Sequence, residues 1–535
     1  MTHIAGGRVD DGGGAMRIAV LGGGPGGLFA AALARSADPT REVTVFERNR
    51  AEDTFGFGVV FSDATLAEIH AADPVLRTAL TEHGVHWDPI EVRLHGERLS
   101  CGGNGMAAVE RRTLLRLLQE RALGAGVDVR FSTEADPDEL LAAGYDLVVA
   151  ADGANSRLRN RFPEVFGATV ETATAKFIWL GTTYPFDGLT FVHERGPHGV
   201  FAVHGYPIGN GVSTFIVETD EASWRAAGLD AFDVTQPPGP SDERTKEYLQ
   251  ELFAPQIDGA ELLVNNSRWS NFRTLRTARW THRAGGTGIA LLGDAAHTAH
   301  FSVGSGTKMA MEDAIALVAA LDEHGDDVDA ALGAYEAVRR PQVARIQDSA
   351  RPSLSWWEHF GRSHDAMPPW QFAYHFFTRS LPDAKLRRRD AGFVDEVHRS
   401  WAAEHGAAPL DSPLDVAGRR VPGRVVQVRD GAVALPGGAL PLRDAPPGTG
   451  EPWGLAVRAP EEEAGLPPAL EAVARGTAAG AALVAVSGGT ALTRRLLCEA
   501  ARLEHRVPSL LVEEAGPDVR LTAVLSGRTD LVAAP

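Results

Sequence analysis

A glycine-rich turn near the start of the chain constrains the fold more than any other feature. Residues 17–36 read RIAVLGGGPGGLFAAALARS, which predicts an apolar strand, a tight turn and an alanine-rich helix, and residues 42–46 predict a second strand. The pattern G-x-G-x-x-G is met by Gly22, Gly24 and Gly27. Glu47 follows Gly27 by 20 residues, the spacing at which a carboxylate contacts a ribose hydroxyl. This βαβ unit therefore predicts a Rossmann-like dinucleotide-binding fold.

Two later motifs ask for the same kind of ligand. A buried strand at 145–151 ends in Asp152-Gly153, and a strand at 288–292 ends in Gly293-Asp294. The Asp294 carboxylate can accept hydrogen bonds from sugar or ribityl hydroxyls. Beyond it, Gly304 and Gly306 allow close approach of the backbone, and a helix from about Thr307 directs its positive end at the ligand.

Composition narrows the partners. The 535 residues include 52 Lys plus Arg and 70 Asp plus Glu, a net charge of −18, which argues against nucleic acid and anionic membranes. An anionic substrate must therefore meet a local basic patch. Two cysteines and no apolar run of about 20 residues favour a cytoplasmic protein without a membrane span. No metal site is predicted.

The pattern of apolar residues divides the chain. Short apolar and aromatic runs after residue 176 predict antiparallel strands, and composition shifts toward Pro, Gly and Ala after about residue 407. The predicted fold class is an α/β Rossmann-like dinucleotide-binding domain with an inserted antiparallel β-sheet substrate domain, plus a small α/β C-terminal domain. The predicted parts are a disordered tail (1–15), a discontinuous dinucleotide-binding domain (16–175 and 266–350), a β-sheet substrate domain (176–265), a helical region (351–406) and a C-terminal domain (407–535).

Together, these three motifs resemble the FAD-dependent aromatic hydroxylases of the para-hydroxybenzoate hydroxylase type over roughly residues 16 to 395. Arg111 matches the arginine that opens the family pattern R-x-x-L-x-x-x-L and contacts the cofactor. The resemblance implies FAD as cofactor and NAD(P)H as a transient co-substrate. The residues expected to bind the cofactor are Gly22, Gly24, Pro25, Gly26, Gly27, Glu47, Arg48, Arg111, Asp152, Gly153, Gly293, Asp294, Gly304, Gly306, Thr307 and Lys308.

The same resemblance implies the reaction. NAD(P)H reduces FAD, the flavin takes up O₂, and a flavin hydroperoxide passes OH to an electron-rich aromatic ring, while the protein binds, orients and excludes water. His300-Phe301 stand where most relatives carry two prolines. His300 and His204 are the candidate groups that polarise or deprotonate a phenol, and Phe301 the candidate that packs against the ring.

Several segments look like the subgroup of salicyloyl-CoA 5-hydroxylases and anthraniloyl-CoA monooxygenases. They are FGFGVVFSDATL at 55–66, VHGYPI at 203–208, STFIVE at 213–218, WSNF at 269–272 and KLRRRD at 385–390. This implies an aromatic CoA thioester as substrate, above all salicyloyl-CoA hydroxylated para to its phenol to give gentisoyl-CoA. Residues expected to contact substrate are Phe57, Tyr206, Trp269, Arg387 and Arg389. Anthraniloyl-CoA, indole and other free aromatics stay as alternative substrates. A homodimer stays open as the assembly of the chain.

The C-terminal segment resembles the closing part of the flavin reductase barrel that is fused to anthraniloyl-CoA monooxygenases. The similar stretches are AALVAVSGG at 481–489 and LSGRTD at 525–530. About 130 residues follow the boundary, whereas a complete (β/α)₈ barrel needs about 250. We therefore expect a shortened, catalytically inactive remnant, and a hydroxylase rather than a fused reductase.

Overall fold

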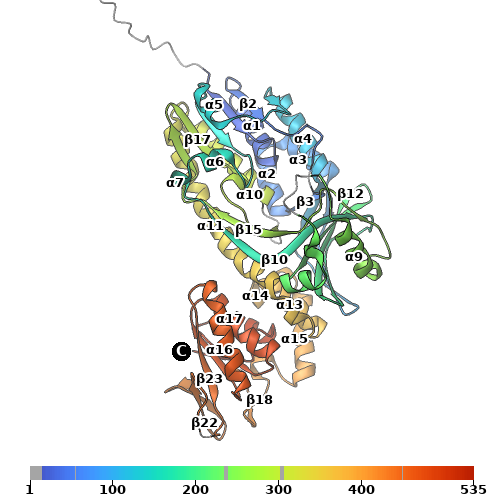
Figure 1. Ribbon diagram of the computed structural model, residues 1–535, viewed down its shortest axis with the longest axis vertical. Helices are drawn as coiled ribbons and strands as arrows, with labels where there is room; N and C mark the ends of the chain where they lie inside the picture. Colours follow the sequence, from blue (N-terminus) through green and yellow to red (C-terminus); the bar gives the residue numbers. More distant parts are fainter. Residues whose placement is uncertain (1–14, 55, 234–238, 302–305, 449, 535) are drawn as a thin grey trace, which may run out of the picture.

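The computed structural model describes residues 15–54, 56–233, 239–301, 306–448 and 450–534. The predicted tail and Gly304 lie outside these ranges, apart from residue 15. In Figure 1 the two large sheets occupy the upper part of the molecule and the C-terminal domain lies below them, with helices of the 361–405 region between. No helix in the described ranges has the length and apolarity that a bilayer crossing requires.

The glycine motifs lie on a six-stranded sheet with the order β16-β17-β9-β1-β2-β8. Its strands are β1 (Arg17–Leu21), β2 (Glu42–Phe46), β8 (Asp128–Arg130), β9 (Leu147–Ala150), β16 (Thr281–Ala284) and β17 (Thr287–Leu291). All neighbours pair in parallel except β16, which is antiparallel to β17. Since parallel strands end at the same edge, the motifs that follow β1, β9 and β17 are brought together there.

Helices cover this sheet and complete its core. The long ones are α1 (Pro25–Ala37), α4 (Arg111–Gly124), α10 (Gly306–His324) and α11 (Val328–His359). Shorter helices are α2 (Asp63–Ala72), α3 (Pro74–His83), α5 (Pro137–Ala142), α6 (Arg157–Arg161) and α7 (Pro163–Phe166). Apolar faces of α1, α4 and α10 share one buried core with the strands, as at Phe29, Leu118 and Leu317. The predicted Rossmann-like unit is confirmed.

A second, mostly antiparallel sheet lies beside the first. Its order is β14-β10-β13-β12-β11-β5-β6, with β15 also paired to β10. The strands are β5 (Ile90–Leu94), β6 (Glu97–Cys101), β10 (Thr169–Thr182), β11 (Leu189–Gly196), β12 (Gly199–Gly209), β13 (Val212–Thr219), β14 (Leu262–Leu263) and β15 (Ser270–Arg276). Two helices, α8 (Glu221–Ala226) and α9 (Glu243–Phe253), flank it, and β3 (Gly58–Ser62), β7 (Met106–Glu110) and β4 (Val85–Trp87) form a small third sheet.

The C-terminal part is an α/β domain whose sheet nearly closes on itself. Its order is β20-β21-β22-β23-β24-β25-β26, and a bridge joins Val425, just before β20, to Val532 of β26. The strands are β20 (Val428–Arg429), β21 (Ala432–Leu435), β22 (Gly438–Arg443), β23 (Gly454–Ala459), β24 (Val484–Gly488), β25 (Ser509–Val512) and β26 (Leu531–Ala533), beside a hairpin of β18 (Leu414–Val416) and β19 (Arg419–Val421). The helices are α16 (Leu466–Ala478), α17 (Ala491–Glu499) and α18 (Pro517–Leu525). The small α/β C-terminal domain is confirmed and its sheet is barrel-like, whereas its origin as a shortened, inactive reductase barrel stays a prediction.

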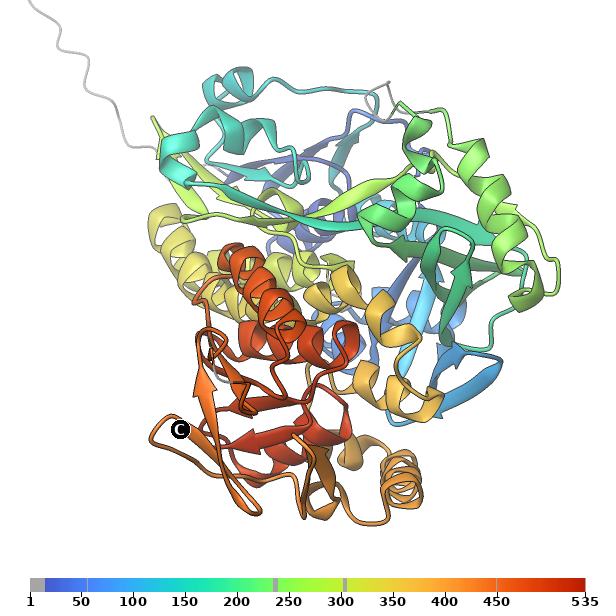
Figure 2. The same cartoon turned by 60° about the horizontal axis from the view of Figure 1, so that its bottom comes forward.

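Four helices connect the two parts: α12 (Gly361–His364), α13 (Pro369–Phe377), α14 (Asp383–Arg389) and α15 (Ala391–His405). Figure 2 shows this segment, in gold to orange, running from beside the second sheet to beside the C-terminal domain. Phe372 of α13, Phe191 of β11 and Leu497 of α17 belong to one buried apolar cluster. Because that core is continuous, the C-terminal domain holds the connecting helices against the second sheet.

Candidate active site

A cavity of about 1190 Å³ lies at the carboxyl edge of the six-stranded sheet. Its lining runs from the β1–α1 turn, past β9, β17 and the second sheet, to the connecting helices α13 and α14. Pockets for one small molecule usually measure about 300–1,000 Å³. This cavity therefore has room for a dinucleotide and a second ligand.

Backbone forms the first end of the cavity. Gly22 has φ +102°, and a Cβ there would lie 2.3 Å from the Ala151 carbonyl oxygen. A Cβ on Gly27 would lie 2.1 Å from the Gly22 carbonyl oxygen, so this turn admits no side chain at either position. Gly24 differs, since nothing lies within 4 Å of its Cβ position and it lines the cavity. As the N-cap of α1, with Pro25 following, it leaves helix N–H groups without a side-chain partner, which suits a pyrophosphate.

Two aspartates supply the acceptors predicted from the sequence. Asp294 lines the cavity, where burial raises the pKa of its carboxyl and the charges of His297 and Arg111 oppose that effect. Asp152 accepts a hydrogen bond from the Arg157 backbone N–H at 2.8 Å, but its buried Oδ1 has no partner among the described residues. A buried acceptor without a donor fits a ligand that brings hydroxyl or N–H groups.

Glu47 is held at the end of β2 beside the glycine turn. Its Oε2 accepts from the Gly23 backbone N–H at 2.6 Å, and its Oε1 accepts from the backbone and side chain of Asn49, both at 2.7 Å. The carboxylate is thus oriented at the position expected for a ribose contact. Together with the glycine turn and the two aspartates, it fits FAD.

Ten of the residues expected to bind the cofactor line the cavity: Gly24, Pro25, Gly26, Gly27, Arg111, Gly153, Gly293, Asp294, Gly306 and Thr307. Gly22, Glu47 and Asp152 flank it and shape it through the contacts given above. Arg48 is exposed outside the lining, and Lys308 pairs with Glu312 at 3.3 Å. The roles of Arg48 and Lys308 stay predictions.

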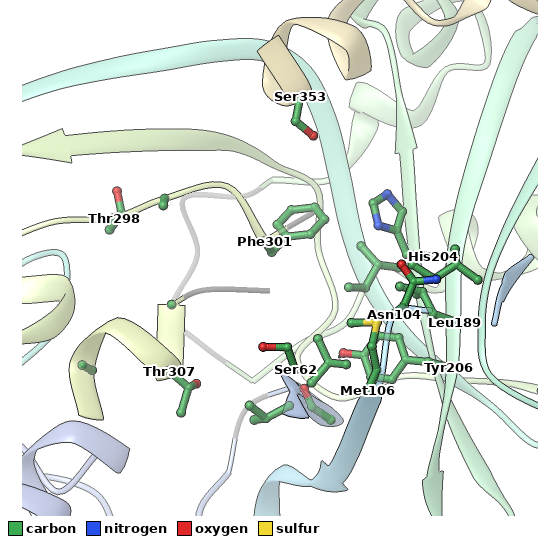
Figure 3. Close-up of a pocket in the computed structure, with 18 of the residues that line it drawn as sticks. Ser62, Asn104, Met106, Leu189, His204, Tyr206, Thr298, Phe301, Thr307 and Ser353 are labelled. Atoms are coloured by element: carbon green, nitrogen blue, oxygen red, sulfur yellow. Dashed lines mark hydrogen bonds between the residues drawn. The ribbon is translucent and has the colours of Figure 1, made fainter. Parts of the chain in front are cut away.

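Aromatic side chains form the middle of the cavity. The Phe301 ring lies 5.0 Å from that of Phe177, 5.9 Å from that of Trp179 and 5.5 Å from that of His204, and all four residues line the cavity. Figure 3 shows Phe301 and His204 pointing into the same space, with Ser353 on their side and Thr307 on the other. This arrangement suits a flat aromatic ligand.

His204 belongs to a buried cluster that also contains Glu218 and His300. His204 of β12 pairs with Ile216 of β13, so Glu218, two residues further along β13, is its diagonal neighbour on the same face. Nε2 of His204 lies 2.8 Å from Oε1 of Glu218. Nε2 of His300 lies 3.7 Å from the other carboxylate oxygen. Burial lowers the pKa of His204 well below its usual range, lowers that of His300 to about 3, and raises that of Glu218 well above its usual range. Neutral imidazoles beside a protonated carboxyl can receive and pass on a proton.

Of the three predicted catalytic residues, His204 and Phe301 line the cavity, whereas His300 lies behind them. The His300 ring stacks on Phe301 at 4.3 Å and meets Phe272 edge-on at 4.9 Å. Direct contact between His300 and a substrate stays untested, but this position favours a supporting role.

Of the five residues predicted to contact the substrate, two line the cavity and three do not. Tyr206 and Arg389 line the cavity, and the Tyr206 hydroxyl donates to the Gly58 carbonyl at 3.3 Å. Trp269 is buried in the second sheet's own core, where its Nε1 donates to Thr245 at 2.8 Å, and Phe57 packs near Gly181. Arg387 pairs with Asp395. Phe57, Trp269 and Arg387 thus lie outside the cavity lining.

Sequence reasoning missed Glu218 and Arg379. Glu218 ends the quoted run STFIVE, where an acid in an otherwise apolar strand is itself a signal. Arg379 lines the cavity after the aromatic helix α13. Nothing in the local sequence distinguishes it from an exposed arginine, because its environment comes from helix α11 and the second sheet.

Comparison with known proteins agrees with this geometry. Residues 15–350 match a family described as "FAD binding domain". The chain is 58% identical over 524 residues to a salicyloyl-CoA 5-hydroxylase of Streptomyces sp, covering 97% of this chain and 99% of that protein. It is 38% identical over 341 residues to a 3-hydroxy-4-methyl-anthranilyl-[aryl-carrier protein] 5-monooxygenase of Streptosporangium sibiricum, covering 64% and 89% of the two chains.

Solved structures show the same fold. A crystal structure of 2-methyl-3-hydroxypyridine-5-carboxylic acid oxygenase superposes with a TM-score of 0.52 at 22% identity, covering 64% of this chain and 93% of that one. The motifs, the cavity and these matches agree with one another. The chain therefore belongs to the FAD binding domain family and is an FAD-dependent aromatic monooxygenase.

Proposed function

We propose that this enzyme hydroxylates an aromatic acyl-CoA thioester, converting salicyloyl-CoA to gentisoyl-CoA with NAD(P)H and O₂. The reaction balances as salicyloyl-CoA, NAD(P)H, H⁺ and O₂ giving gentisoyl-CoA, NAD(P)⁺ and water. The observation that carries the proposal is the cavity itself, which leads from the FAD-binding edge past an aromatic wall to arginines of the connecting segment. In support, the names of two relatives both specify a thioester-linked aromatic acyl group.

Bound FAD would carry electrons from the nicotinamide to O₂ and supply the oxygen atom that enters the ring. The remaining tasks fall to this chain. Phe301, Phe177 and Trp179 hold the ring flat and exclude water, which favours attack on the ring over loss of the activated oxygen.

His204 takes the phenol proton at Nδ1, the ring nitrogen that is not enclosed with Glu218. A phenolate donates more electron density to the para position than a phenol does, so proton removal assists the oxygen transfer. Glu218 lies 2.8 Å from the other ring nitrogen, Nε2, and so orients the ring, and His300 supports Glu218 and Phe301 from behind. We therefore assign His204 as the base, and Glu218 and His300 as positioning residues.

Arg389 is exposed and lines the cavity, so it is the arginine we assign to the CoA phosphates. Its neighbours Lys385 and Arg388 are also exposed and extend the positive charge along α14. Such a patch attracts an anionic thioester locally, whereas the overall charge of −18 would repel it. A cytoplasmic location and a homodimer stay predictions, the latter open to light scattering.

The test is oxidation of NADH and of NADPH by the FAD-loaded enzyme, with product identification, for salicyloyl-CoA, free salicylate, anthraniloyl-CoA and indole. We expect stoichiometric gentisoyl-CoA from salicyloyl-CoA and little coupled product from the other three. Hydroxylation of free salicylate at an equal kcat/KM would refute the thioester assignment. Preferred turnover of anthraniloyl-CoA or indole would establish the corresponding alternative.

A further inference from the structure

Arg379 is half-buried at the substrate end of the cavity. It follows α13, lines the cavity, and its guanidinium lies over the Phe376 ring at 3.9 Å. Its Nε donates to Ser353 Oγ at 2.8 Å and its Nη1 to the Phe376 carbonyl at 2.8 Å. Both partners are neutral, and in the described residues Nη2 donates to no acceptor.

Two arginines elsewhere in the protein have a carboxylate beside them. Arg339 lies 2.9 Å from Asp313, and Arg362 lies 2.6 Å from Glu499. Within the described ranges, by contrast, no carboxylate comes within 4 Å of Arg379. Glu218, whose charge would raise the pKa of Arg379, has its own pKa raised well above its usual range by burial and so carries a proton rather than a charge.

A cation that is partly withdrawn from water and has no counter-ion is costly. Because burial disfavours the charged form, it lowers the pKa of Arg379 to about 9. The side chain still carries its charge at neutral pH. The charge and the spare donors of Nη2 are therefore left for a ligand that enters the cavity.

The position of Arg379 indicates which part of the ligand it meets. The Phe191 ring lies 4.9 Å from the ring of His204 and 4.6 Å from the ring of Phe376, over which the Arg379 guanidinium lies. Ser353, which holds the guanidinium, lies on the same side of the cavity as His204 and Phe301 (Figure 3). Arg379 thus belongs to the aromatic part of the cavity, on the side of the base.

We propose that Arg379 determines substrate specificity by binding the ortho oxygen of the aromatic ring as an anion, and so selects a salicyloyl over an anthraniloyl thioester. This inference rests on the function proposed above. A guanidinium has donors only. The phenolate oxygen and the neighbouring thioester carbonyl of salicyloyl-CoA present two acceptors to the two N–H groups of Nη2, whereas the amine of anthraniloyl-CoA presents N–H groups and benzoyl-CoA has no ortho group.

The test compares binding of salicyloyl-CoA, benzoyl-CoA and anthraniloyl-CoA to FAD-loaded wild type, Arg379→Met and Arg379→Lys, followed by the flavin absorbance change. We expect Arg379→Met to weaken salicyloyl-CoA binding about 10- to 100-fold, the loss expected for a hydrogen bond to a charged group. Benzoyl-CoA binding should change less than about 3-fold, which also shows that the variant is folded. Arg379→Lys keeps the charge but lacks the planar guanidinium, so its affinity for salicyloyl-CoA should lie between those of wild type and Arg379→Met.

The spectrum of the bound ligand gives a second readout. In wild type the phenol of bound salicyloyl-CoA should ionise at a lower pH than in solution, and Arg379→Met should raise that pKa by about 1–2 units. A uniform loss for all three thioesters would place Arg379 on the CoA moiety and overturn the inference while the proposed function stands. If wild type hydroxylates no thioester, the proposed function itself fails.

Discussion

The two ends of the cavity are built in different ways. At the FAD end, turns that directly follow β1, β9 and β17 present backbone groups, and Gly22 and Gly27 are fixed by contacts below 2.5 Å that any Cβ would make. At the substrate end, His204, Phe301 and Arg379 come from three segments separated by up to 175 positions. Local backbone geometry therefore builds the cofactor site, whereas tertiary packing of side chains builds the substrate site.

The largest effect should come from the base. His204→Gln should lower the hydroxylation rate about 10²- to 10⁴-fold, the usual contribution of a positioned general base, while leaving the flavin content unchanged. Quantification of hydroxylated product per bound flavin measures it. His193→Gln is the matched control, since His193 is also a buried strand histidine but packs against Trp357 and Phe372 outside the cavity lining. Equal rates for His204→Gln and wild type would remove His204 from the mechanism.

Two glycines test the backbone character of the FAD end. Gly27→Ala should destabilise the flavin-free protein by about 1–3 kcal/mol, because its Cβ would lie 2.1 Å from a backbone oxygen that cannot move away. Gly24→Ala should change that stability by less than about 0.5 kcal/mol, since its Cβ position is empty, yet weaken FAD binding because it lines the cavity. Urea unfolding and FAD titration separate the two effects. Comparable destabilisation by both variants would contradict this assignment.

The titratable groups of the substrate end should appear in the pH dependence of stability. The pKa of His300 is lowered by burial to about 3, against about 6.5 in the unfolded chain, so between these values the unfolded state binds a proton that the folded state excludes. Stability is therefore lost as pH falls through this window. His300→Gln should reduce the slope by up to about 1.4 kcal/mol per pH unit, measured by urea unfolding between pH 7.5 and 4.5.

Glu218→Gln provides the opposite control. The raised pKa of Glu218 means that the folded state keeps a proton which the unfolded state releases above about 4.5, so this residue contributes stability that is lost as pH rises. Its removal should make the slope steeper. Slopes that shift in the same direction for both variants would show that the two groups do not titrate as their burial requires.

The same contrast explains how much could be predicted from the sequence. Spacing located the strand ends, so the Rossmann-like fold, Asp294 and Arg111 were predictable from local patterns. The burial of Trp269 in a separate core and the partial burial of Arg379 depend on which strands and helices pack together, which no local pattern encodes. His204 lies between these cases, because the sequence places it on a predicted strand but does not identify its partner Glu218.

The smallest expected effect concerns the arginines of α14. Arg389→Ala should weaken CoA-thioester binding about 3-fold, the size expected for one exposed charge contact, and the loss should shrink at high salt. Arg387→Ala should leave binding unchanged, because Arg387 pairs with Asp395 outside the cavity lining. Both side chains lie on one short helix two positions apart, so composition and local structure are matched and only access to the cavity differs. If Arg387→Ala instead gave the larger, salt-sensitive loss, the thioester would leave the cavity along a different face of α14, and the substrate end would extend beyond the lining described above.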